Sequence, residues 1–142
     1  MIHVGQRILV IDNTGAKFAK CLRIYKNQKF AKLGELIFVS IKKVIPNKKV
    51  KKGEKYKGVV IRLRGRMIRN TISYYLSCTT DAIILLKSGT NDLLGTRILG
   101  PTMQEFLPPK PKKVVVGGVR SSKKQYSKIS YKKIYSLAPF KI

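Results

Sequence analysis

The chain has 142 residues, with 31 lysines and arginines against six acidic residues and a formal net charge of +25. An excess of that size opposes compaction of a free monomer and indicates a polyanionic partner, for which nucleic acid is the commonest candidate. Hydrophobic residues make up 44%, enough to bury one core, and the longest apolar runs are only strand-sized, which argues against both a wholly disordered chain and a membrane-spanning helix.

Short apolar runs separated by glycine, proline and asparagine recur through the first hundred residues, as is typical of an all-β fold. The predicted strands are residues 8–11, 19–25, 36–45, 59–63 and 82–86. In the third of them, Ile37, Val39 and Ile41 share one predicted face, with Ser40 and Lys42 on the other. Five short strands favour a closed barrel because closure removes exposed sheet edges. We therefore expect a mainly β protein: a small five-stranded closed β-barrel with a short C-terminal helical region and a basic extension.

The fourth predicted strand carries a row of arginines. Its apolar face is predicted to hold Val59, Ile61 and Leu63. A spacing of two along one strand would project Arg62, Arg64 and Arg66 from the opposite face, as a stripe that can follow a phosphate backbone. The alternative is a solvated charged face, which is disfavoured because no acidic residues are interspersed to form surface pairs.

A second basic cluster lies between the third and fourth predicted strands. Its four lysines flank Val50 and lead to Gly53, which predicts a charged loop with one apolar anchor. Three tyrosines nearby, Tyr56, Tyr74 and Tyr75, are candidates for stacking on bases, with packing against the core as an equal alternative.

The character of the chain changes after residues 100–101. Thr102, with Glu105 three residues on, predicts the start of a short helix, which the prolines from Pro108 onward would end. Residues 108–128 are basic and lack acids, which predicts an extension that becomes ordered on a partner. Residues 130–137 predict a final turn or two of helix. The expected organisation is a barrel domain with the following short helix (1–107), the basic insertion (108–128) and a C-terminal helical segment packing on the barrel (129–142).

The sequence offers little for catalysis or metal binding. The single histidine, His3, is expected at the surface, and the six acids include no pair at useful spacing. Cys21 lacks a partnered histidine for nucleophilic work. Cys21 and Cys78 are read as two free thiols, with a disulfide as the alternative. We expect no enzymatic activity, no cofactor and no metal ion.

Seven motifs, in order along nearly the whole chain, together resemble one known family. They are DNTGAK at 12–17 with Cys21 five residues after Ala16, IPN at 45–47, KVKKGE at 49–54, GVVIR at 58–62, DAIILL at 81–86, GTRILGP at 95–101 and KIYSLAP at 133–139. The sequence is similar to the universal family of the fourteenth protein of the large ribosomal subunit. The resemblance implies a structural constituent of that subunit and a five-stranded barrel with a short C-terminal helical region.

The resemblance also implies partners and contact residues. Members bind large-subunit rRNA on the subunit-facing side, pack beside the third and nineteenth large-subunit proteins, and contribute to intersubunit bridges with small-subunit rRNA. The implied rRNA-binding residues are Asn13, Thr14, Lys17, Lys20, Lys51, Lys52, Arg62, Arg64, Arg66 and Arg69. The implied bridge residues are Pro46, Asn47, Lys48 and Lys49. Thr96 and Arg97 would lie on the face that ribosome-silencing factors recognise.

Two departures from the family pattern bear on origin and local geometry. Residues 69–73 read RNTIS where the family commonly has a Pro-Asp-Gly turn, and residues 108–128 form an insertion that bacterial members generally lack. The insertion and the lysine and isoleucine bias favour an organelle-encoded protein of a mitochondrial ribosome, as does a start where bacterial relatives begin. A plastid-type organelle and the bacterial cytoplasm are the alternatives. Functional alternatives are a free-standing barrel that binds single-stranded RNA and a basic protein of membrane surfaces.

Overall fold

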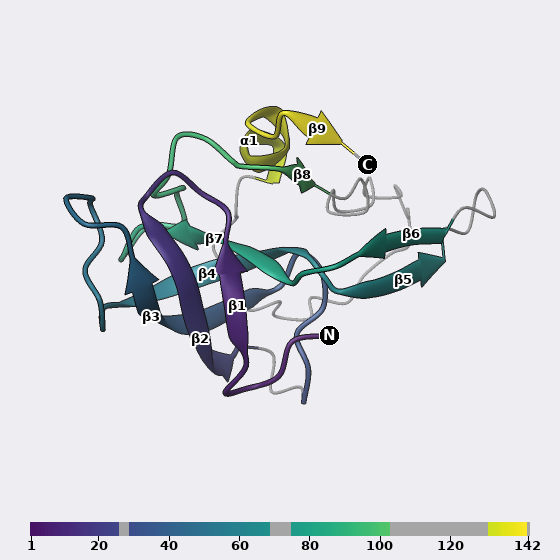
Figure 1. The fold of residues 1–142 in the computed structure, drawn as a ribbon, viewed down its shortest axis with the longest axis horizontal. Coiled ribbons are helices and arrows are strands. Elements are labelled where there is room, and N and C mark those ends of the chain that lie inside the picture. Colours follow the sequence, from purple (N-terminus) through teal and green to yellow (C-terminus); the bar gives the residue numbers. More distant parts are fainter. Residues whose placement is uncertain (26–28, 69–74, 103–130, 142) are drawn as a thin grey trace, which may run out of the picture.

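A closed five-stranded barrel forms the centre of the molecule (Figure 1). The computed structural model describes residues 1–25, 29–68, 75–102 and 131–141. The barrel strands are β1 (Arg7–Val10), β2 (Ala16–Ile24), β3 (Leu36–Val44), β4 (Lys55–Arg62) and β7 (Ala82–Leu86). Neighbours pair antiparallel in the order β1-β2-β3-β4-β7, and the parallel pairing of β1 with β7 closes the barrel. The predicted mainly β fold with a five-stranded closed barrel is confirmed.

Each predicted strand region overlaps one barrel strand, but two of the strands begin several residues earlier than expected. β2 begins at Ala16, and β4 begins at Lys55. The first residues of β4 are the exposed Lys55 and the half-buried Tyr56 and Lys57, so the apolar pattern from which the strand was predicted begins only at Val59. Polar residues at a strand's start are compatible with pairing because the ladder uses backbone groups.

The barrel interior holds an aliphatic core to which all five strands contribute. Ile37, Val39 and Ile41 all lie in it, which confirms the face predicted for the third strand. Ser40, expected on the outward face, is nevertheless buried. It pairs with Lys20 on one side and Lys55 on the other, so two long side chains flank this short one on the outer surface.

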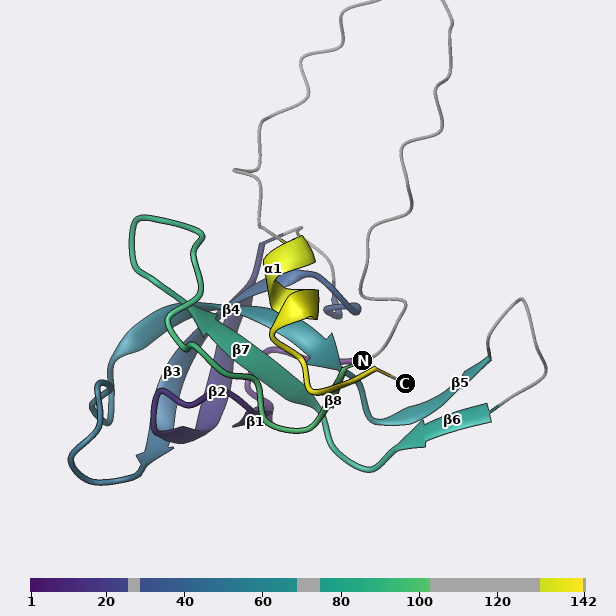
Figure 2. The same ribbon diagram turned by 90° about the horizontal axis from the view of Figure 1, so that it is seen from above.

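A second core covers the outer face of β4 and β7. It contains Val59, Ile61, Ala82, Ile84 and Leu86 from these strands, together with Ile11, Ile98 and Ile134. Ile134 comes from helix α1 (Tyr131–Ser136), which lies over this part of the barrel in Figure 2. The short C-terminal helix predicted from residues 130–137 is thus confirmed.

The face predicted for the fourth strand is wrong. Val59 and Ile61 lie in the outer core, while Leu63 lies with Val60 in the inner one. The pairing of β4 with β7 shifts its register between Val60 and Arg62. Such a bulge inserts one residue and reverses the alternation beyond it.

Two short two-stranded sheets complete the described chain. Strands β5 (Gly65–Ile68) and β6 (Tyr75–Cys78) form a hairpin that projects away from the barrel in Figures 1 and 2. Strands β8 (Pro101–Thr102) and β9 (Phe140–Lys141) pair in parallel. Thr102 lies in β8, and the short helix that we expected it to begin falls outside the described residues. Its expected partner Glu105, the turn at 69–74 and the predicted insertion 108–128 lie outside the described residues.

The prediction that Arg62, Arg64 and Arg66 form one stripe along a single strand is also wrong. Strand β4 ends at Arg62, and β5 begins only at Gly65, whose φ of 127° is in the range that favours glycine. Arg62 thus belongs to the barrel, Arg64 to the connection, and Arg66 to the hairpin. A spacing of two in the sequence places these three residues on one face only if one strand carries them all.

Candidate nucleic-acid interface

Asp12 holds the turn at 12–15 against β7 from inside the protein. Its Oδ1 accepts the backbone N–H of Thr14 at 3.0 Å and the Thr14 hydroxyl, and its Oδ2 accepts the backbone N–H of Leu85 at 2.9 Å. Burial raises the pKa of the Asp12 carboxyl, and these hydrogen bonds oppose that rise. Thr14 is 1% exposed. Because its hydroxyl is bonded internally, Thr14 is not in a position to contact RNA, which corrects its predicted role.

The loop between β3 and β4 is built as the sequence predicted, around one apolar anchor. Val50 is 2% exposed and packs in the inner core. Glu54 accepts the backbone N–H of Lys51 and the hydroxyl of Tyr56, both at 2.8 Å, and these bonds lower the pKa of Glu54. Tyr56 packs against the inner core, which is the core-packing alternative for this residue. The exposed residues of the loop include the predicted bridge and rRNA-binding residues Pro46, Asn47, Lys48, Lys49, Lys51 and Lys52.

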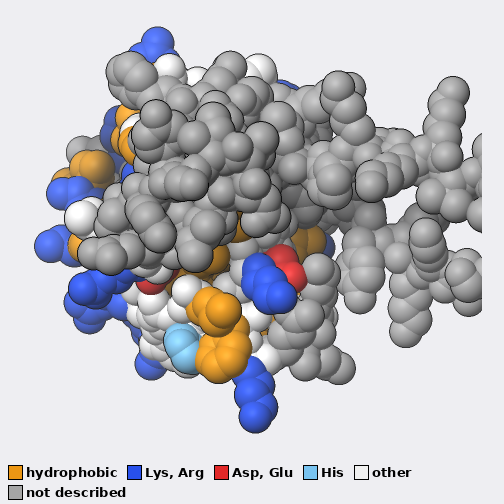
Figure 3. All heavy atoms as spheres, turned by 90° about the vertical axis from the view of Figure 1, so that its right-hand side faces the viewer, with side chains coloured by type: hydrophobic (Ala, Val, Ile, Leu, Met, Phe, Trp, Pro, Cys, Tyr) orange, Lys and Arg blue, Asp and Glu red, His pale blue; other side chains and the backbone are white. Residues whose placement is uncertain are grey.

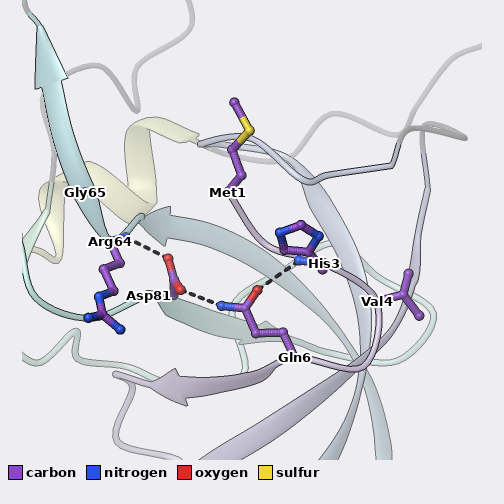
Figure 4. A pocket seen from close by; sticks show the side chains of 7 residues that line it. All are labelled: Met1, His3, Val4, Gln6, Arg64, Gly65 and Asp81. Carbon is purple, nitrogen blue, oxygen red and sulfur yellow. Dashed lines mark hydrogen bonds between the residues drawn. The ribbon is translucent and has the colours of Figure 1, made fainter.

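A chain of hydrogen bonds fixes the backbone at Arg64 (Figure 4). The Arg64 N–H donates to Oδ1 of Asp81 at 2.7 Å, and Nε2 of Gln6 donates to Oδ2 of Asp81 at 2.6 Å. Oε1 of Gln6 in turn accepts the backbone N–H of His3 at 2.9 Å. His3 is exposed as expected, beside blue cationic and orange apolar side chains on the face drawn in Figure 3. Asp81 therefore binds the backbone of Arg64 and not its guanidinium. The exposed Arg64 side chain lies at the rim of the hollow between the N-terminus and the hairpin.

The Arg62 side chain, at the end of β4, is fixed by hydrogen bonds to Thr80. Its Nε donates to the backbone oxygen of Thr80 at 3.3 Å, and its Nη2 donates to the Thr80 hydroxyl at 3.0 Å. The side chain is half-buried, so part of the guanidinium remains accessible. Of the other two predicted arginines, Arg66 lies in β5, where only its backbone is described, and Arg69 lies outside the described residues.

Strands β1 and β2 bring two cations together that the sequence did not relate. Arg7 is directly opposite Lys20 in the antiparallel ladder, and both side chains are exposed. Like charges in directly opposite positions destabilise a sheet, and a bound anion removes that repulsion. Lys17, further along β2, is also exposed. Arg7 was missed because the cross-strand register is not visible in a single sequence.

Three predicted groups of residues meet at one end of the barrel. The turn at 12–15 lies between the other two loops: Ile45 N–H donates to the Gly15 oxygen at 2.8 Å, and Thr96 N–H donates to Oδ1 of Asn13 at 2.8 Å. Asn47, in the bridge loop, has a φ of 60°, a conformation that asparagine tolerates well. The predicted rRNA-binding, bridging and factor-facing residues are thus close neighbours here, although they come from distant parts of the sequence.

The described residues bear on three features: a metal site, a disulfide and a membrane-spanning helix. Within the described ranges, no group of three or more histidine, cysteine or acidic residues is arranged to hold a metal ion. Cys21 is buried in the inner core and Cys78 is half-buried, and both are free thiols. Among the helices that the structure describes, none is long and apolar enough to cross a membrane.

The fold and the surface define a class: a small, strongly basic β-barrel whose lysines and arginines, in the part of the chain that the structure describes, are exposed or half-buried. Residues 1–120 match the family model described as Ribosomal protein L14p/L23e. The chain belongs to this family, and its role is that of a structural protein of the large ribosomal subunit, active in translation. Proteins of this kind are in general structural and not catalytic.

Proposed function

We propose that this chain binds large-subunit rRNA directly through the exposed cations of its barrel and loops. The supporting observation is how the acids are used. Asp12, Glu54 and Asp81 accept backbone N–H groups and neutral side-chain donors. Their carboxylates are therefore engaged mainly by the protein's own hydrogen-bond donors, which leaves exposed lysines and arginines for phosphates, the contacts that dominate affinity for nucleic acid.

The proposed contact set follows the sequence prediction with two changes. Thr14 is removed because it is buried, and Arg7 is added because it faces Lys20. Asn13 is exposed, but its amide is engaged with Thr96 and Arg97. Asn13 stays in the proposed set, and the other members kept from the sequence prediction are Lys17, Lys20, Lys51, Lys52, Arg62, Arg64, Arg66 and Arg69.

Further contacts belong to the same proposal. Pro46, Asn47, Lys48 and Lys49 are exposed at the tip of the β3–β4 loop, and we assign them to a bridge with small-subunit rRNA. Thr96 and Arg97 are exposed at the neighbouring corner, and we assign them to recognition of a ribosome-silencing factor. The third and nineteenth large-subunit proteins are the proposed protein neighbours. We retain the proposed division into 1–107, 108–128 and 129–142.

The proposed location is the mitochondrial ribosome, from an organelle gene. It rests on the lysine and isoleucine bias and on the basic segment at 108–128. Plastid and bacterial origins are the alternatives, and the genome that carries the gene decides among them.

Co-sedimentation tests the proposal. Tagged protein should travel with large subunits through a gradient and remain bound after a high-salt wash, because many phosphate contacts act together with neighbouring proteins. A variant with Lys51 and Lys52 changed to glutamate should be lost from the particle, whereas the exposed control Lys87→Glu on the β7–Leu93 loop should be retained. Release of the wild-type protein as a free RNA-binding species would favour a free-standing RNA chaperone, and salt-resistant binding to anionic vesicles without RNA would favour a membrane-surface protein.

A further inference from the structure

Residues 95–99 run alongside residues 11–13 and are fixed there by backbone contacts. Asp12 and Ile98 form an isolated antiparallel bridge, and Leu99 N–H donates to the Ile11 oxygen at 2.6 Å. A Cβ on Gly95 would lie 2.9 Å from both Cβ of Asp12 and Oδ1 of Asn13, so the two segments approach as closely as only glycine allows. The exposed pair Thr96 and Arg97 is therefore held at a defined place.

Asn13 supplies the side-chain part of this contact. Its Oδ1 accepts the N–H of Thr96 at 2.8 Å and the N–H of Arg97 at 3.3 Å, and its Nδ2 donates to Oγ1 of Thr96 at 2.9 Å. The two backbone donors fix the orientation of the amide, because a flipped amide would direct NH₂ at N–H groups. Both lone-pair positions of Oδ1 are thereby occupied.

The consequence concerns the proton of the Thr96 hydroxyl. Since Oγ1 already accepts from Nδ2 of Asn13, the hydroxyl proton is directed elsewhere, and the side chain is exposed. Thr96 is therefore presented as a hydrogen-bond donor. The exposed Arg97 guanidinium beside it has only donors, so together with the free Thr96 proton this corner is complementary to an acceptor, above all an anionic one.

The surface beside this corner favours a protein over RNA as the source of that acceptor. A groove of about 370 Å³ is lined by the apolar side chains of Leu9, Phe18, Ile45 and Leu99, and also by Asn13, Lys17 and Lys48. Leu99 is 57% exposed and Ile45 is 39% exposed. Burial of such apolar surface stabilises contact with apolar side chains of a protein, whereas a sugar-phosphate backbone has few to offer.

We propose that Asn13 is a positioning residue. Its amide fixes the Thr96–Arg97 backbone and turns the Thr96 hydroxyl outward as a donor, so that the corner selects a protein partner with a carboxylate next to an apolar side chain. The inference rests on the proposed function in that it takes the ribosome-silencing factor as the partner used for testing. It adds the residue that sets the direction of hydrogen bonding and the chemical group that the partner must supply.

The positioning part is tested without any partner. In the full-length protein, Asn13→Ala should raise the amide exchange rates of Thr96 and Arg97 by about fivefold, since each loses an acceptor that contributes about 1 kcal/mol. Asn13→Asp keeps Oδ1 and should retain the wild-type rates. Unchanged rates in Asn13→Ala would overturn the positioning role.

The direction of the hydroxyl is tested by binding to large subunits. In Asn13→Asp the second carboxylate oxygen accepts from the Thr96 hydroxyl and turns its proton inward, so affinity for purified silencing factor should fall at least about tenfold, as in Thr96→Val. Thr96→Ser should remain close to wild type. A double-mutant cycle controls for the negative charge that Asn13→Asp introduces: in a Thr96→Val background, the same substitution should cost little further affinity. An equal cost in both backgrounds would show simple charge repulsion and overturn the inference.

Failure of the proposed function gives a different pattern. If the corner binds rRNA, these variants weaken retention on washed large subunits while exchange rates change as expected, and the protein-partner inference is wrong. If wild-type subunits retain the chain but never bind the silencing factor, the factor assignment fails, and with it the partner part of the inference. The exchange result for Asn13 stands or falls by itself.

Discussion

Strands β4 and β7 have two buried faces, and the two are covered in different ways. The inner face packs against the other barrel strands, with Ile83 and Leu85 among its core residues. The outer face is covered largely by residues that follow the barrel in the chain, with Ile98 and Ile134 in one cluster with Ile84. The inner core is therefore inseparable from barrel closure, while the outer core depends on the docking of a separate segment.

The inner core should show the largest effect of substitution. Ile83→Ala removes a fully buried side chain where barrel strands meet and should lower the free energy of unfolding by about 2–5 kcal/mol, because a cavity remains in a closed structure. Urea titration checks this value. Leu22→Ala, at an exposed position of β2, is the control and should change stability little. Equal effects of the two variants would contradict the assignment of the inner core.

The outer core should open without loss of the barrel. Ile134→Ala removes the buried contact of α1 and should weaken its docking by about 1.5–3 kcal/mol. The expected result is faster exchange of the Leu137 amide, which donates to the Lys133 oxygen, with slow exchange retained in β2 and β3. Lys133→Ala, exposed on the same helix, is the control. Simultaneous loss of protection in β2 would show that the two cores form one cooperative unit.

Gly95 lies three residues before Ile98, in the segment that contributes Ile98 to the outer core. Gly95→Ala places a methyl group against Asp12 and Asn13 and should destabilise by about 1–3 kcal/mol through overpacking. Thr90→Ala, exposed in the preceding loop, is the control. Thermal unfolding measures the difference, and a neutral Gly95→Ala would mean that residues 95–98 move aside freely.

Asp12 joins the turn at 12–15 to β7, and its titration should give the smallest of these effects. Burial raises its pKa above the ordinary 3.8, so the folded state binds this proton more tightly than the unfolded state. The resulting stabilisation is fully present below pH 3.8 and is lost as pH rises through the folded-state pKa. Relative to Asp12→Asn, the wild type should therefore lose stability with rising pH in this window. A profile for Asp12→Asn that runs parallel to that of the wild type would contradict the assignment of this pH dependence to Asp12.

The sequence predicted the barrel well because its inner residues alternate along strands, as Ile37, Val39 and Ile41 do. It predicted β4 less well for a physical reason. Val59, Val60 and Ile61 are all buried, so alternation alone does not say which side faces inward. The bulge before Arg62 then changes the register, and no residue type in this stretch announces it.

The sequence predicted most of the residues of the candidate interface, but not how they are arranged in space. Val50 as the anchor of a lysine loop followed from its apolar character among charges. The opposition of Arg7 and Lys20 depends on strand register, and the burial of Thr14 depends on a buried Asp12. The contact of Asn13 with Thr96 joins residues 83 positions apart, which no local pattern indicates.

The central claim is that outward cations bind rRNA phosphates, and the salt dependence of that binding tests it most directly. With roughly eight phosphate contacts, the slope of log affinity against log salt for the isolated protein and an rRNA fragment should be about −6 to −7. The Lys51→Ala and Lys52→Ala double variant should make that slope shallower by about 1.5, because two contacts are removed. A wild-type slope shallower than about −2 would contradict the account.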